Sequence, residues 1–219
     1  ILYKIFFIIF KKELKDNFLN NKAWFTIAFF LLCLLVFPLS FGASTNFQNE
    51  LSIPAIWVSA LFANLIALDQ MYKEDYSDGT LTYYLINDIP FSTVVIAKCL
   101  SHWFFCGVPI IILSPFCLYV LSGSFLSYNL IIMLLIGTPL LTLIGSPISA
   151  LMLGSRVRGP IITFITLPFY FPIIIFGIMG TSQNSYNLNA EFYLLLSMLS
   201  IVIVFFPLLT IKILKSSIN

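Results

Sequence analysis

The sequence is poor in charged residues. Only 9% of its 219 residues are Asp, Glu, Lys or Arg, while 60% are hydrophobic. A soluble domain carries roughly 25% charged residues, and a chain with a mean hydropathy of +1.02 cannot cover its surface with polar groups in water. The composition therefore excludes a soluble globular domain and predicts an integral membrane protein.

Charge is missing altogether from five long windows, residues 23–49, 51–68, 99–155, 159–190 and 192–211. A membrane-spanning helix needs about 20 mostly apolar residues, and breaks rich in Ser, Asn, Gly and Pro subdivide the longer windows. We predict an all-α integral membrane protein with one transmembrane domain over residues 1–219. Its six spans are expected near residues 23–43, 53–72, 98–121, 128–152, 161–180 and 192–212.

Lysine and arginine are absent from every second connection between these spans. All 11 lie before span one, between spans two and three, between spans four and five (Arg156 and Arg158) or after span six. The only charged residues in the other three connections are acidic, Glu50 and Glu191. Because Lys and Arg mark the cytoplasmic side of a membrane, we expect both termini there, or on the equivalent side in an organelle.

Residues 3–20 combine apolar and basic residues. The apolar positions recur every three or four residues, which is typical of one helical face, and Lys11, Lys12 and Lys15 lie opposite. Basic amphipathic helices of this kind lie in the membrane interface. We therefore predict an interfacial helix leading into span one, with a helix in the cytosol as the alternative.

The connection at residues 73–97, together with Asp69 just before it, is acidic. Gly79 can follow the end of one helix, Asp78 or Thr80 can cap the next, and Leu81 begins a short apolar face. We interpret this segment as a short helix across the mouth of the bundle that can receive force from a peripheral motor. The alternative is a solvated charged loop.

Motifs for catalysis and for nucleotide or nucleic-acid binding are missing. Residues 75–79 resemble the start of the metal-binding motif of CDP-alcohol phosphotransferases, but Thr82-Tyr83 stands in place of Ala-Arg and the later ligands are absent. Such an incomplete set would hold Mg²⁺ poorly. There is no Gly-x4-Gly-Lys-Ser/Thr phosphate loop, and no basic cluster interleaved with aromatic residues. We therefore predict neither an enzyme nor a nucleic-acid-binding protein.

Polar side chains within the predicted spans are few. His102, the single histidine, shares one helical face with three cysteines, Cys99, Cys106 and Cys117. The cysteine spacing fits neither a zinc site nor covalent haem attachment. We therefore predict no metal site, cysteines that pack as small apolar groups, and a hydrogen-bonded structural histidine.

Lys98 is expected to extend to the inner interface and to pair with Asp69. Prolines and glycines are expected to interrupt spans four and five, as in many transporter sites. The alternative is kinked packing, in which small residues let the helices approach closely. Neither span contains a charged residue, which argues against a proton- or sodium-driven carrier.

Several segments together resemble one family: FPLSFG at 37–42, AIWVSAL at 55–61, DYSDGTL at 75–81, AKCLSHW at 97–103, GTPLLTLIG at 137–145 and LPFYFPIIIFG at 167–177. From about Lys11 to Lys215 the chain resembles CcmB, the membrane subunit of the ABC-type complex in cytochrome c maturation. One departure is Thr82, where the family usually has an acidic residue.

The resemblance implies an ABC-2-like permease subunit in a bacterial or mitochondrial inner membrane. A CcmA-like ATPase would hydrolyse ATP, CcmC-like and CcmD-like subunits would complete the complex, and a CcmE-like chaperone would carry haem. This chain would couple hydrolysis to haem delivery or to release of the loaded chaperone, without binding a cofactor of its own. Asp75, Asp78, Gly79 and Leu81 would contact the ATPase. The alternative is an ABC-2 exporter of a lipid, polysaccharide or drug.

Overall fold

Helices make up the regular structure of this chain. The computed structural model describes residues 2–19, 22–41, 45–123, 127–153, 160–182 and 190–218, and within these ranges it contains helices and no strands. They are α1 (Leu2–Leu19), α2 (Lys22–Phe41), α3 (Thr45–Asp69), α4 (Lys73–Ser77), α5 (Thr80–Ile86), α6 (Phe91–Ser122), α7 (Tyr128–Leu151), α8 (Pro160–Ser182) and α9 (Ala190–Ile218).

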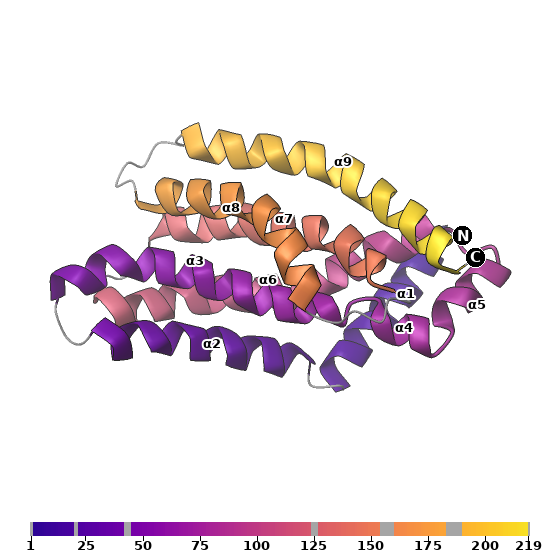
Figure 1. The fold of residues 1–219 in the computed structure, drawn as a ribbon, viewed down its shortest axis with the longest axis horizontal. Coiled ribbons are helices and arrows are strands. Elements are labelled where there is room, and N and C mark those ends of the chain that lie inside the picture. Colours follow the sequence, from indigo (N-terminus) through magenta and orange to yellow (C-terminus); the bar gives the residue numbers. More distant parts are fainter. Residues whose placement is uncertain are drawn as a thin grey trace.

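The long helices form one elongated bundle (Figure 1). In the described part of the chain, α3, α6, α7, α8 and α9 are each long and apolar enough to cross a membrane, and α1 with α2 would add a sixth span if that bent pair counts as one. The predicted all-α membrane fold is confirmed. That α2 crosses alone, with α1 in the interface, stays a prediction.

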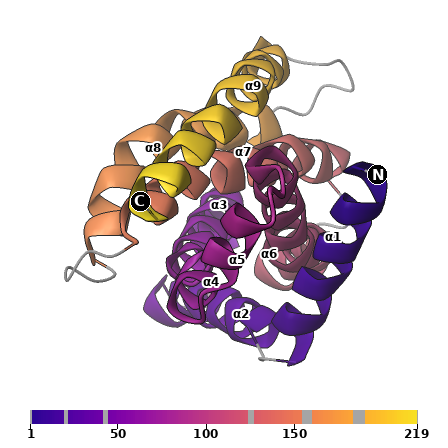
Figure 2. The same ribbon diagram turned by 90° about the vertical axis from the view of Figure 1, so that its right-hand side faces the viewer.

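One end of the bundle carries α1, α4 and α5 together with both ends of the chain (Figure 1). Figure 2 looks onto this end, where α4 and α5 lie across the bundle and α1 runs along its side in contact with α6. We call it the α4–α5 end. The helix segments that contain lysines, namely α1, α4, the beginning of α6 and the end of α9, lie at or toward this end (Figure 1). Arg156 and Arg158 lie outside the described residues.

Trp57 on α3 fills the centre of the bundle and is fully buried. Its ring lies against Gly137 of α7 and Gly177 of α8, where an added Cβ would come within 2.5 Å of ring atoms. Its indole N–H donates to Thr181 Oγ1 at 3.4 Å. Glycine lets membrane helices approach closely, so this ring sets how α3, α7 and α8 pack.

Buried polar groups link the helices near their middle. The Tyr170 hydroxyl donates to the Leu141 carbonyl at 2.5 Å, and its oxygen lies 3.3 Å from Asn64 Oδ1. The Asn64 amide donates to Thr142 Oγ1 at 3.4 Å, and His102 Nδ1 lies 3.4 Å from the same oxygen. Because hydrocarbon offers no water, such groups must satisfy one another. His102 is hydrogen-bonded, as predicted.

Proline begins one helix and stays inside others. α6 begins at Phe91 directly after Pro90, so this helix contains the predicted span at residues 98–121 and extends before it. α7 continues through Pro139 and Pro147, and α8 continues through Pro168 and Pro172, so the expected interruption of these spans is wrong. Tight packing against neighbouring helices and buried hydroxyls allows membrane helices to tolerate proline.

Candidate functional site

A helix–turn–helix formed by α4 and α5 lies at the α4–α5 end. Gly79 joins the two helices with φ +78°, a left-handed conformation that glycine adopts readily. The Asp78 carboxylate accepts a hydrogen bond from the Thr80 N–H at 3.0 Å and so caps α5. Slight burial acts to raise the pKa of Asp78, but this hydrogen bond leaves the pKa below its usual value. The predicted end of α4 before Gly79 is confirmed, while Gly79 itself occupies the N-cap position of α5 and Asp78 binds the first N–H of that helix.

The two sides of this turn differ in character. Leu81 and Tyr84 are buried in a small core that also contains Ile9 of α1 and Phe91 of α6. The exposed side carries large apolar side chains of both short helices, namely Tyr76 of α4 and Tyr83 and Ile86 of α5. Exposed apolar groups with polar neighbours are typical of an interaction surface. We call this side the outer face of α4–α5.

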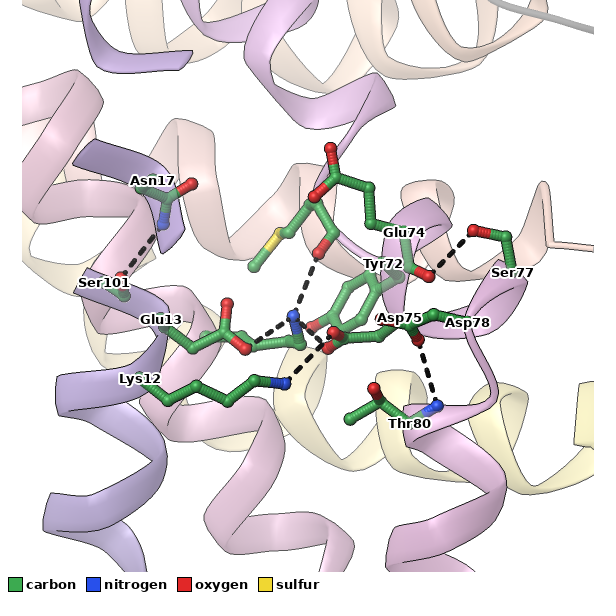
Figure 3. A network of polar contacts seen from close by, with 12 residues as sticks. Lys12, Glu13, Asn17, Tyr72, Glu74, Asp75, Ser77, Asp78, Thr80 and Ser101 are labelled. Atoms are coloured by element: carbon green, nitrogen blue, oxygen red, sulfur yellow. Dashed lines mark hydrogen bonds and ion pairs between the residues drawn. The ribbon is translucent and has the colours of Figure 1, made fainter. Parts of the chain in front are cut away.

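Lys98 is the centre of a buried ionic cluster on the inner side of the turn. It is only 4% exposed. Its Nζ lies 3.0 Å from Glu13 Oε1 of α1, is ion-paired with Asp75 Oδ2 of α4, and donates to the Met71 carbonyl at 3.3 Å. An ammonium has three donors, so each finds an acceptor. Figure 3 shows Glu13 and Asp75 reaching this point from opposite sides.

Two further groups complete the Lys98 cluster. Lys12 Nζ lies 3.7 Å from Asp75 Oδ1 and 6.0 Å from the centre of the Tyr84 ring. The ring of Tyr72 lies 5.7 Å from Lys98 Nζ. Burial raises the pKa of Glu13, while Lys98 acts to lower it. Two lysines therefore face two carboxylates, which balances charge in a place that excludes most water.

This arrangement corrects two sequence expectations. Lys98 does not extend to the interface, and Asp69 pairs with Lys73 at 3.5 Å, so the predicted pair of Asp69 and Lys98 is wrong. Lys98 lies on the side of α6 that faces the bundle, where only carboxylates brought in by α1 and α4 can balance it. Sequence reasoning missed Glu13. Its spacing of four residues from buried Ile9, on one helical face, was the available signal.

The four residues predicted to contact an ATPase divide between the two sides of the turn. Asp78 and Gly79 are accessible at the turn. Asp75 and Leu81 are buried inside the chain, Asp75 in the ionic cluster and Leu81 in the small core. A partner that binds this end therefore meets Asp78 and the outer face, while Asp75 and Leu81 hold the turn in place.

Hydrogen bonds lead from the cluster to α7 and α9. The Tyr72 hydroxyl and Ser146 Oγ of α7 are 2.8 Å apart, and Ser146 Oγ and Thr210 Oγ1 of α9 are 3.2 Å apart. The Cys99 thiol donates to Ser146 Oγ at 3.4 Å. In addition, Ser149 Oγ donates to the Leu68 carbonyl at the end of α3 at 2.7 Å. The turn between α3 and α4 is therefore hydrogen-bonded to α6 and α7, and through Ser146 of α7 it is linked to α9.

A cavity of about 250 Å³ lies beside the cluster. Its lining includes Glu13, Asp75 and Lys98, and further along α6 His102 and Cys106, whose Nε2 and Sγ atoms are 3.7 Å apart. Among the described residues, no group of three His, Cys, Asp or Glu side chains is arranged to hold a metal ion. The volume is below the roughly 300–1,000 Å³ of ordinary small-molecule pockets, but it leaves room for water and for side-chain movement.

Comparison with known proteins gives a consistent result. A family model described as "CcmB protein" matches residues 4–216. "Heme exporter protein B" of Pseudomonas aeruginosa is 33% identical over 160 residues, which cover 73% of this chain and 71% of that protein. The protein of the same name from Haemophilus influenzae is 32% identical over 179 residues (79% of each chain), and that from Escherichia coli K12 is 31% identical over 196 residues (87% of each).

Proposed function

This chain belongs to the CcmB family, and we propose that it is the transmembrane subunit of an ABC-type complex in c-type cytochrome biogenesis. The observation that carries the proposal is the family match over residues 4–216, which includes nearly all described helices. Relatives are named for haem export, so haem is the ligand that the complex would handle. The chain would couple ATP hydrolysis to haem delivery or to release of a haem-loaded chaperone in the inner membrane.

Depletion of the protein tests this function in its own host. Covalently bound haem in c-type cytochromes should fall, while b-type cytochromes stay at their normal level, and a plasmid copy should restore the loss. Recovery of an ATPase with the purified chain, together with normal c-type cytochromes after depletion, would instead favour an ABC-2 exporter of another substrate.

A separate ATPase subunit would bind the outer face of α4–α5. The exposed rings of Tyr76 and Tyr83 and the side chain of Ile86 offer an apolar contact, and Asp78 adds a charge. The sequence has no phosphate loop of its own, so ATP hydrolysis would come from this CcmA-like partner. CcmC-like and CcmD-like subunits would pack against the spans.

A single aromatic residue tests the binding surface. Tyr83→Ala should reduce ATPase recovery with the tagged chain, because truncation of a central aromatic contact costs about 2 kcal/mol or more, roughly 30-fold in affinity. Tyr193→Ala is the matched control, since Tyr193 is 56% exposed and Tyr83 is 60% exposed. Tyr193 belongs to the first turn of α9, and α9 begins at the opposite end of the bundle (Figure 1). Equal ATPase recovery with both variants would contradict this assignment.

We further infer that the α4–α5 end faces the cytoplasm and that α1 lies in the interface at that side. Ile9 and Glu13 face the protein, whereas two other faces of α1 are exposed. One is apolar, with Tyr3, Phe7 and Phe18. The other is basic, with Lys4, Lys11 and Lys15. An apolar face beside a basic face suits acyl chains on one side and anionic headgroups on the other.

A further inference from the structure

Four segments that are distant in the sequence meet at Lys98. Glu13 comes from α1, the Met71 carbonyl from the turn after α3, Asp75 from α4 and Lys98 itself from α6. We propose that Lys98 is the positioning residue through which movement of α4 and α5 reaches α1 and α6. This inference rests on the proposed function, in which an ATPase moves the outer face of α4–α5.

The charges at Lys98 allow one of its contacts to open. If α4 withdraws Asp75, Lys98 keeps Glu13 and the Met71 carbonyl, so its charge is not left unpaired in a buried place. An unpaired buried charge is strongly unfavourable, and Glu13 prevents that state. Lys12, whose side chain is 40% exposed, can turn to water when Asp75 leaves. Asp75 is therefore the contact that moves, and Glu13 the one that stays.

The cavity beside the cluster gives this movement space. Glu13, Asp75 and Lys98 all line its volume of about 250 Å³. Protein interiors are otherwise close-packed and resist small displacements. At this place, a shift of Asp75 admits water next to Lys98 instead of forcing side chains together. The same cavity reaches Cys106 on α6, so opening of the cluster should increase the access of water-soluble reagents to that thiol.

Hydrogen bonds also connect the Lys98 cluster with helices α7 and α9, so that a displacement of its residues can move these helices. Met71, whose carbonyl accepts a hydrogen bond from Lys98, precedes Tyr72, and the Tyr72 hydroxyl lies 2.8 Å from Ser146 Oγ on α7. Ser146 in turn lies 3.2 Å from Thr210 on α9. Movement of the turn between α3 and α4 thus acts on α7 and α9 through short buried hydrogen bonds.

The test measures modification of Cys106 by a small water-soluble maleimide in the purified complex, with Cys33, Cys99 and Cys117 replaced by Ser. ATP binding to the retained ATPase should change the rate in the otherwise unaltered chain. Asp75→Asn should raise the rate without nucleotide, because the moving contact is weakened. Glu13→Gln should leave that rate unchanged or lower it, because release of Asp75 would then strand Lys98. In both variants, the effect of ATP on the rate of Cys106 modification should be roughly 2- to 30-fold smaller than in the unaltered chain.

The opposite directions separate a positioning role from a structural one. If both residues only stabilised the fold, both variants would raise the Cys106 rate. Asp69→Asn is the matched control, since Asp69 pairs with Lys73 in the same region but at the exposed surface, and it should behave like the unaltered chain. Equal changes in Asp75→Asn and Glu13→Gln, or an ATP response that survives both, would overturn the inference about Lys98 alone. Failure of the unaltered chain to retain any ATPase would overturn the proposed function as well.

Discussion

The contact between Trp57 and Gly177 can be tested by adding one methyl group. An added Cβ at Gly177 would lie 2.5 Å from Cη2 and Cζ2 of the Trp57 ring and 2.8 Å from its Cε2. The ring is fully buried and hydrogen-bonded to Thr181, so it cannot turn aside without losing that bond. Gly177→Ala should therefore force α3 and α8 apart.

A second glycine on α8 serves as the matched control. An added Cβ at Gly180 would meet the Cε atom of Met133 at 2.5 Å, its sulfur at 3.0 Å and Glu191 Cβ at 3.2 Å. The end of a methionine side chain adapts easily. Both substitutions gain the same helix propensity, about 1 kcal/mol in favour of Ala. The difference between the two variants therefore isolates the contact with the rigid ring.

Overpacking of this kind costs about 1–3 kcal/mol. For a chain of this size, 1 kcal/mol corresponds to about 2–4 °C in Tm, so Gly177→Ala should melt about 2–12 °C below Gly180→Ala. Thermal unfolding in detergent, followed by size-exclusion chromatography with fluorescence detection, measures this difference. Equal Tm values for the two variants would refute the packing argument.

Three further predictions use the same assay. Gly79→Ala should destabilise the turn by about 1–2 kcal/mol, because Gly79 has φ +78°, a left-handed conformation that is unfavourable for Ala. The cost is not a clash, since the added Cβ meets no atom within 4 Å. Gly79→Asn should destabilise the turn less, because Asn adopts this conformation more readily than Ala. Ser146→Ala should cost about 1–3 kcal/mol, because it removes the partner of the buried Tyr72 hydroxyl, whereas Ser197→Ala, at an exposed serine on α9, should have little effect. Anionic phospholipid should raise the Tm of the unaltered protein. This gain should disappear when the three exposed lysines of α1, Lys4, Lys11 and Lys15, are replaced by Gln. Each lysine contributes about 1 kcal/mol near an anionic surface.

The sequence by itself determined the class of fold, because that depends on local signals. Apolar length and the absence of charge decide whether a helix can cross a membrane, and both are read within about 20 residues. The end of α4 and the hydrogen bond of Asp78 at the start of α5 were also predictable. A glycine that follows a helix and an aspartate beside the next helix act on backbone atoms only one or two residues away.

Only the tertiary structure decided what the charged residues do. Asp75 was predicted as a surface contact and Lys98 as an interfacial residue, yet the two pair in a buried cluster with Glu13, a residue 85 positions before Lys98 in the sequence numbering. Nor does any local pattern bring Trp57 against Gly137 and Gly177. Burial of an ammonium or an indole depends on which helices pack together, and hence on residues far apart along the chain. The partners of Lys98 and Trp57 followed from packing, whereas the helices that carry them followed from composition.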